Sequence, residues 1–288
     1  MSGAPGAPAP AAQLVPFAAL SAAYFAHIGF FNPYLGLWLK ELGMPLVAIG
    51  LLASVQSLTR VFAPYVWGAL SDRTGERVKL LRWSAGAALC ASMGLWFGTH
   101  AWWIGVVLLL LFLNTSSMMS LTEAATAHLV AGDLGRYGRV RLWGSAGFLV
   151  TVFLAGAWFE RFGMAHFPGW TVATLLLVCL CTWRLPDLRE GAREAVRGED
   201  APVAAVLALP VVRWFLAALF FHVAAHFSIY VFLSLYLDAL GYSKTWIGVM
   251  WAVSVVVEIV WFFVQGRWME RLSPVSYTHL TLPTKRIV

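Results

Sequence analysis

Eight long apolar runs constrain the fold of this chain more than any other feature. Each run has about 20 residues and ends at charged or turn-forming residues, a length that crosses the hydrocarbon core of a bilayer as an α-helix. The alternating segments of about ten residues that mark a membrane β-barrel are absent from the sequence. The pattern predicts an all-α, multi-pass membrane protein whose spans lie at 14–38, 45–69, 83–99, 101–125, 142–160, 167–183, 211–236 and 245–265.

Composition excludes two other classes of protein. Of the 288 residues, 60% are hydrophobic and 12% are charged, against roughly 25% charged residues in a soluble domain. The net charge of +6 comes from Lys and Arg in short clusters between apolar runs, without the basic and aromatic interleaving of a nucleic-acid surface. Cys90, Cys179 and Cys181 lie inside apolar runs, so neither a disulfide framework nor a metal site is expected. The expected surroundings are a lipid bilayer, with no nucleic-acid partner.

The distribution of Lys and Arg predicts the orientation of the spans. Every second connection is basic: the connection after the second span contains four Lys and Arg residues, whereas the connection after the third contains none. Basic connections remain on the cytoplasmic side of a membrane. We therefore expect the N-terminus and the even-numbered connections in the cytoplasm.

The order of spans and polar segments predicts a division of the chain into parts. Residues 1–13 are rich in Ala, Pro and Gly and are expected to be disordered, and the charged segment 184–209 is expected to be a cytoplasmic linker. The linker separates a six-helix bundle at 14–183 from two further spans at 210–273. Many transporters consist of two matching halves. A bundle of six spans followed by two further spans therefore looks like part of a transporter that has twelve spans in all. The polar segment 274–288 resembles a translated sequencing adaptor, and we interpret it as foreign.

A motif between the second and third spans suggests a family. The segment 68–77 reads GALSDRTGER, and it resembles the G-x-x-x-D-R-x-G-x-R signature of the major facilitator superfamily through Gly68, Asp72, Arg73, Gly75 and Arg77. The resemblance implies a fold of two six-helix bundles, of which this chain contains the first bundle and the first two helices of the second. It also implies a gating role for the motif. Glu76 stands where the family usually has a basic residue, a departure that implies a weaker charge network.

Two further segments narrow the resemblance to a subgroup. The segment 138–147 is similar to the start of span 5 in lactose permease, and the segments 226–230 and 257–259 look like spans 7 and 8 of phenylpropionate permeases. This resemblance implies that Glu123 and Arg141 pair across a central cavity. Members of the subgroup carry aromatic acids, sugars or nucleosides, so the resemblance leaves the solute open.

Ionisable residues inside the spans are the first candidates for a solute or proton pathway, because a charge at membrane depth is costly unless it pairs or faces water. Glu258 lies fourteen residues into its span, too deep for a short side chain to reach the interface. Arg60 is a candidate for binding a substrate carboxylate, although its long side chain also permits it to reach the interface. The alternative for Glu123 is a carboxylate that reaches the interface or caps a helix. These three residues and Arg141 are the charged candidates.

Polar residues of the spans complete the list of candidates. His222 and His226 lie one turn apart on one face, but no third metal ligand is placed nearby, so no metal site is expected there. His226 is expected to form a hydrogen bond in the cavity, and His222 is expected to have a structural role. His27, Asn32 and Tyr230 are polar enough to line a pathway, yet such side chains also join helices by hydrogen bonds.

Together these features predict a secondary active transporter: a proton-coupled symporter that takes up a small organic solute such as a phenylpropionate-like aromatic acid. Sugar or nucleoside symport is the alternative within the superfamily, and a membrane scaffold or membrane-embedded enzyme is the alternative outside it. No nucleotide-binding or hydrolase motif is present, so we expect no enzymatic activity and no cofactor beyond a proton gradient. The expected location of the protein, as a monomer, is a bacterial cytoplasmic (inner) membrane. Because the resemblance assigns the main coupling residues to later spans, this chain by itself is not expected to transport.

Overall fold

The computed structural model describes residues 11–130, 134–187 and 207–269, and within these ranges every regular element is helical. Two 3₁₀ turns, η1 (Gly94–Trp96) and η2 (Met164–His166), join longer helices. The α-helices are α1 (Ala11–Glu41), α2 (Leu46–Thr74), α3 (Arg77–Met93), α4 (Ala101–Val130), α5 (Leu134–Phe162), α6 (Phe167–Trp183), α8 (Pro210–Ala239) and α9 (Lys244–Met269). Most of the N-terminal segment, most of the proposed linker and all of the segment 274–288 lie outside the described residues.

Each predicted span coincides with a helix, so the prediction of an all-α, multi-pass membrane protein is confirmed. In the described residues, seven helices are long and apolar enough to cross a membrane. The eighth, α3, has 17 residues and is continued by η1.

Two predicted helix starts were wrong, each by several residues. The third span was expected to begin at residue 83 and the fifth at residue 142, but α3 begins at Arg77 and α5 at Leu134. Basic residues that we assigned to connections, including Lys79 and Arg139, therefore lie within the first two turns of these helices. Basic side chains mark the edge of the hydrocarbon core. Lys and Arg have helix propensities as favourable as those of most residues, so a helix can continue past them into water.

Close contact between α1 and α5 depends on glycine. A Cβ on Gly29 of α1 would lie 2.8 Å from the carbonyl oxygen of Phe148, and a Cβ on Gly147 of α5 would collide with the carbonyl oxygen of Ala22. Small residues are the usual means by which membrane helices bring their backbones together. The α1–α5 pair is therefore the most tightly interlocked part of the fold.

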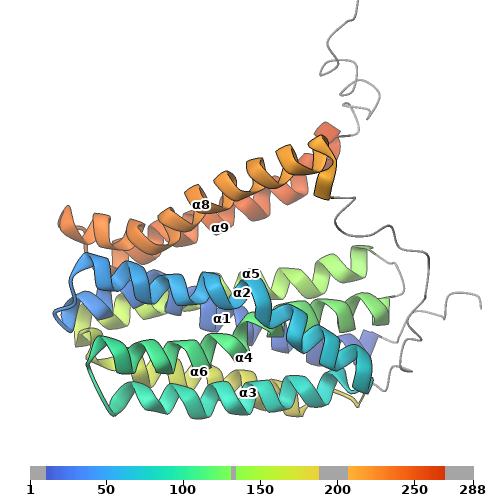
Figure 1. Ribbon diagram of the computed structural model, residues 1–288, viewed down its shortest axis with the longest axis horizontal. Helices are drawn as coiled ribbons and strands as arrows, with labels where there is room; N and C mark the ends of the chain where they lie inside the picture. The colour runs from blue at the N-terminus through green and yellow to red at the C-terminus, as the bar shows by residue number, and fades with distance from the viewer. Residues whose placement is uncertain (1–10, 131–133, 188–206, 270–288) are drawn as a thin grey trace, which may run out of the picture.

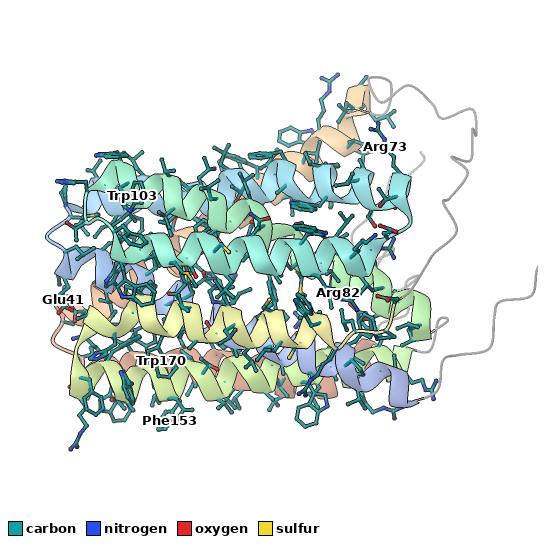
Figure 2. The ribbon with its side chains drawn as sticks, turned by 90° about the horizontal axis from the view of Figure 1, so that it is seen from below. Glu41, Arg73, Arg82, Trp103, Phe153 and Trp170 are labelled. Atoms are coloured by element: carbon teal, nitrogen blue, oxygen red, sulfur yellow. The ribbon has the colours of Figure 1, made fainter. Side chains whose placement is uncertain are left out.

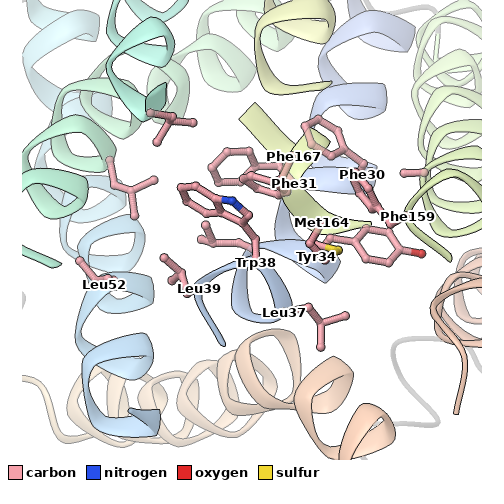
Figure 3. Close-up of a cluster of buried hydrophobic side chains, with 14 of the residues drawn as sticks. Phe30, Phe31, Tyr34, Leu37, Trp38, Leu39, Leu52, Phe159, Met164 and Phe167 are labelled. Carbon is pink, nitrogen blue, oxygen red and sulfur yellow. The ribbon is translucent and has the colours of Figure 1, made fainter. Parts of the chain in front are cut away.

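The largest buried cluster lies beside α1 near the end that contains Glu41. The stacked rings of Trp38 and Phe167, with centroids 5.0 Å apart, lie at its centre. Figure 3 shows Phe30, Phe31 and Phe159 next to Phe167, so that α1, α5 and α6 all contribute rings to the cluster. Burial of so many large rings fixes these helices against one another.

The two ends of the helix bundle differ in their charged residues and in how closely α8 and α9 approach α1 and α5. Figure 2 shows Glu41 at one end and the basic residues Arg73 and Arg82 at the other. In Figure 1, α8 and α9 approach α1 and α5 at the Glu41 end and diverge from them toward the Arg82 end. The α8–α9 pair therefore contacts α1 and α5 near the Glu41 end, and its ribbon lies apart from theirs near the Arg82 end.

Candidate functional site

A cavity of about 540 Å³ lies between α1, α2, α4, α5 and α8. Six of the eight residues that we predicted for a solute or proton pathway contribute to its wall. Apolar side chains, among them Phe25, Ile28 and Met119, make up much of the rest. The six predicted residues in the wall are Asn32, Arg60, Glu123, Arg141, His226 and Tyr230.

Glu123 of α4 and Arg141 of α5 form the ion pair that the resemblance implies. The distance between Arg141 Nε and Glu123 Oε1 is 3.7 Å, and both side chains are partly exposed to the cavity. Two aromatic residues contact the pair. The guanidinium of Arg141 lies 4.2 Å from the ring centre of Phe25, and a hydrogen bond joins the side chain of Tyr137 to Glu123.

Sequence reasoning missed both of these supporting aromatic residues. The ring of Phe25 fits against Gly144, where a Cβ would lie 2.6 Å from it. Aromatic residues make up 15% of the chain, so nothing in the sequence separates Phe25 and Tyr137 from aromatic residues that only fill space.

Arg60 of α2 is a cation in the cavity wall for which the described part of the chain provides no ion pair. Its charge acts on the hydroxyl groups of Tyr24 and Tyr230 instead. Among the described residues of the wall, Arg60 and Arg141 are positive and Glu123 is negative. The charged residues that the structure describes in the wall therefore add up to a net positive charge.

The wall contributed by α8 is a row of rings. The ring centres of His226 and Tyr230 are 4.8 Å apart, and Tyr230 lies 5.1 Å from the ring of Trp251 on α9. The indole N–H of Trp251 donates a hydrogen bond of 2.9 Å to Ser234 Oγ. His222 also lines the cavity, with its ring parallel to that of His226 at 6.3 Å. The row gives the cavity an aromatic side.

Asn32 lies in the cavity wall, whereas His27 does not. Asn32 Oδ1 accepts a hydrogen bond of 3.1 Å from Gln56 Nε2, which joins α1 to α2. His27 is 3% exposed, and its Nδ1 lies 3.0 Å from Thr174 Oγ1 on α6. His27 borders a void of about 10 Å³ that shares Tyr24 and Arg60 with the cavity, a volume of roughly one water molecule. This placement favours the helix-joining role for His27.

Glu258, the candidate with the strongest argument from sequence, is exposed on α9 and is not among the residues that line the cavity. Its charge and that of Arg60 both act on the hydroxyl of Tyr230.

The motif between α2 and α3 forms a turn at the Arg82 end. Gly75 ends α2 in the left-handed conformation, with φ 66°, and its N–H donates to the carbonyl oxygen of Ser71 at 2.8 Å. Arg77 lies 3.9 Å from Asp72 and donates a hydrogen bond of 3.3 Å to Ser71 Oγ. Arg73 is exposed at this turn, and a Cβ on Gly68 would meet no atom within 4 Å in the described structure.

Glu76, the residue that departs from the family pattern, forms an ion pair of 2.8 Å with Lys79 on the next turn. The basic charge of Lys79 is therefore balanced locally, on the surface of α3. The motif residues Asp72 and Arg77 keep their own contact beside it.

Arg82 joins α3 to the end of α6, a role that the sequence analysis did not predict because it counted Arg82 only as a basic residue of a connection. Its guanidinium donates to the carbonyl oxygens of Thr182 at 3.2 Å and Leu185 at 2.7 Å, and it contacts Asp187 at 2.7 Å. Thr182 lies in the last turn of α6 and Leu185 lies just beyond it, in the region where helix carbonyl groups lose their regular i+4 partners. Arg82 thereby fastens α3 to the point where the chain leaves α6.

Comparison with known proteins agrees with this architecture. A family model described as "MFS_1 like family" matches residues 18–285. The probable 3-phenylpropionic acid transporter of Escherichia coli (strain K12) is 29% identical over 255 residues, which cover 87% of this chain and 66% of that protein. The maltose permease of Geobacillus stearothermophilus is 29% identical over 229 residues, with 78% and 57% covered. The chain thus spans less than two thirds of the length of either relative.

The fold itself resembles a solved transporter. The crystal structure of the nucleoside transporter NupG superimposes with a TM-score of 0.72 at 17% identity, covering 90% of this chain and 68% of NupG, and its D323A mutant gives 0.74 at 16% identity. Similarity at this level of identity concerns the fold alone. The family match, which covers most of the chain, decides the assignment: this chain belongs to the MFS_1-like family of the major facilitator superfamily, whose members are multi-pass membrane transporters and not enzymes.

Proposed function

We propose that this chain is part of a proton-coupled symporter that takes up a small organic anion, a phenylpropionate-like aromatic acid. The observation that carries the proposal is Arg60, a cation in the cavity wall with no ion pair in the described structure. The name of the E. coli relative supports the choice of solute. The proposed location is the bacterial inner membrane, with the N-terminus in the cytoplasm and the protein as a monomer.

The charge of the cavity favours an anion. Arg141 already has Glu123 as a partner, so a solute carboxylate gains most by approaching Arg60. At 4 Å, two opposite unit charges attract by about 4 kcal/mol at the effective dielectric constant of a protein surface. A neutral sugar or nucleoside gains nothing comparable at this position.

The neighbouring wall favours an aromatic group on that anion. Phe25, Ile28, Met119 and Phe227 line the cavity together with the row of rings on α8. Aromatic side chains of this kind bind a planar apolar ring by edge and face contacts. A carboxylate joined to a phenyl ring by a short flexible chain matches both features.

Proton coupling is proposed to use Glu123, with Glu258 as a second carboxylate. Protonation of Glu123 breaks its pairing with Arg141 and adds positive charge to the cavity, which favours entry of the anion. Release of the proton after reorientation restores the pair and favours release of the anion. Alternating exposure of the cavity to the two sides completes the cycle.

Equilibrium binding tests the proposal. The purified chain in lipid nanodiscs is titrated with 3-phenylpropionate, maltose and uridine by isothermal calorimetry. We expect binding of 3-phenylpropionate alone, and a loss of about 10- to 100-fold in affinity for Arg60→Gln because one charge-assisted contact disappears. Arg161→Gln, at the far end of α5, is the matched control and should bind as the parent does.

The other outcomes are equally informative. Binding of maltose or uridine, and not of 3-phenylpropionate, would replace the proposed solute with a sugar or a nucleoside. Absence of binding by all three, in a chain that remains folded, would favour a scaffold role. Proton coupling is tested separately, because an uncoupler should abolish accumulation by a full transporter in proteoliposomes and leave binding intact.

A further inference from the structure

A small void of about 10 Å³ lies next to the cavity, between α1, α2 and α4. It shares Tyr24, Asn32 and Arg60 with the cavity wall, whereas His27 borders the void and not the cavity. The volume is that of roughly one water molecule, and a buried water molecule needs about two to four polar partners. The polar side chains around the void therefore decide whether it holds water.

The imidazole of His27 has a defined tautomer, because Thr174 can only accept a hydrogen bond from it. His27 Nδ1 lies 3.0 Å from Thr174 Oγ1. That hydroxyl donates its single proton to the backbone carbonyl oxygens of Trp170 at 2.8 Å and Thr171 at 3.1 Å. The proton between Thr174 and His27 must therefore come from Nδ1. No carboxylate is among the described residues that line the void, so the imidazole is neutral and its Nε2 is an acceptor.

The Nε2 atom of His27 needs a donor that the described residues do not supply directly. His27 is 3% exposed, and its side chain forms one hydrogen bond with the described residues, the one to Thr174. Every side-chain nitrogen or oxygen that is fully enclosed in the described structure has a hydrogen-bond partner. Nε2 has none, so it must border open space, and the void is such a space. A buried acceptor of this kind is costly unless water reaches it.

Arg60, on the α2 side of the void, has donors to spare. Its guanidinium has several N–H groups, and it forms no ion pair with another described residue. A water molecule in the void can accept from Arg60 and donate to His27 Nε2. Tyr24 offers a second acceptor, because its hydroxyl donates its proton to the carbonyl oxygen of Thr115 at 3.0 Å and keeps its lone pairs. The water then has about three partners, the usual number for a buried one.

We infer that the void binds one ordered water molecule, which joins His27 Nε2 to the guanidinium of Arg60 and fixes that cation in the cavity wall. His27 is thus a positioning residue, because it acts on the cavity through the water and through Arg60. The chain of contacts begins at Thr174 on α6, so a single water couples α6 and α1 to α2. If Arg60 binds a solute carboxylate, a consequence that rests on the proposed function, its side chain is already ordered when the anion arrives, which lowers the entropy cost of binding.

Nitrogen NMR tests the water site without any solute. The chain is labelled with ¹⁵N-histidine in lipid nanodiscs, and the signals of His27 are identified by their absence from His27→Asn. We expect a protonated Nδ1, an unprotonated Nε2 with the shift of a hydrogen-bonded acceptor, and magnetisation transfer from water to the ring protons beside Nε2. Arg60→Met should weaken this transfer and move the Nε2 signal toward that of a free acceptor. Arg141→Met is the matched control, because Arg141 lines the cavity and not the void, and it should change neither.

Two substitutions of His27 separate its two contacts. The amide of Asn takes the place of Nδ1 and the amide of Gln reaches the place of Nε2, so His27→Asn keeps the contact with Thr174 and His27→Gln keeps the contact with water. His27→Gln should lower the midpoint of thermal unfolding by about 2–4 °C and bind 3-phenylpropionate as the parent does. His27→Asn should unfold as the parent does and bind about 3- to 10-fold more weakly, the effect of one lost hydrogen bond.

Three results would overturn the inference. A protonated Nε2 in His27 would assign the other tautomer and leave no acceptor facing the void. An Nε2 signal that is unchanged in Arg60→Met, or that moves equally in Arg141→Met, would show that Arg60 does not hold the water. Parallel losses of thermal stability and affinity in both His27 variants would assign a purely structural role. Failure of the parent to bind 3-phenylpropionate would refute the proposed function instead, and the NMR signals would still decide the water site.

Discussion

Replacement of Arg82 by Gln should loosen the connection between α3 and the segment that follows α6. The guanidinium of Arg82 binds two carbonyl oxygens, those of Thr182 and Leu185, and one carboxylate, that of Asp187. Thr182 and Leu185 are almost fully buried, whereas the side chain of Asp187 is 79% exposed. The two carbonyl contacts therefore account for most of the expected effect.

The magnitude follows from these exposures. A hydrogen bond from a charged donor contributes about 1.5–3 kcal/mol, and an exposed ion pair contributes about 0–1 kcal/mol. Water replaces part of the lost bonding, because the Arg82 side chain is itself partly exposed. A net cost of about 1.4–3 kcal/mol is expected, equivalent to a 10- to 100-fold increase in the population in which this segment is detached.

Limited trypsin digestion measures that population. Arg184 is exposed and lies between the two carbonyl groups that Arg82 binds, so cleavage after it reports detachment of the segment. Under conditions where opening is faster than cleavage, the cleavage rate follows the open population. Arg161→Gln is the control. A rate in Arg82→Gln within twofold of the parent rate, for a protein that stays folded, would refute the assigned role.

Three further changes have expected outcomes. Gly147→Val should destabilise the chain by about 3 kcal/mol or prevent folding, because the new side chain collides with the backbone of α1. Thermal unfolding in detergent measures the effect. Gly86→Val, at a position where a Cβ meets no atom within 4 Å, is the control. Trp38→Ala should cost about 3–5 kcal/mol in the same assay through loss of its stacked contact. Glu258→Gln in a full transporter should abolish proton-driven accumulation in proteoliposomes, and unchanged accumulation would remove Glu258 from the proposed mechanism.

Hydropathy was sufficient to predict the helices, but not where two of them begin. Every apolar run became a helix because lipid leaves backbone groups no other partner. The starts of α3 and α5 were missed because Arg77 and Arg139 were treated as loop residues, although a helix extends readily beyond the hydrocarbon core. Charged residues mark the boundary of the membrane, whereas the end of a helix depends on local capping. The left-handed conformation of Gly75, which ends α2, is seen only in the structure.

The candidate site was predicted unevenly, for a physical reason. Arg60 and Glu123 were found because an isolated charge in an apolar run is conspicuous, and the cavity does contain them. Phe25 was missed because its role depends on the three-dimensional relation of α1 to α5, and its sequence context is that of any packing residue. His27 was predicted to line a pathway because it is polar. It instead contacts Thr174, a partner 147 residues away that the sequence does not reveal.

That separation between His27 and Thr174 has a consequence for synthesis of the protein. Ribosomes add roughly 5–20 residues per second, so α1 waits roughly 7–30 s for the residue on α6 that bonds to its imidazole. The main neighbour of α1, the helix α5, also emerges long after it. During biogenesis α1 must therefore be kept at the translocon, or sheltered by an insertase, because an imidazole exposed to lipid without a hydrogen-bond partner is costly.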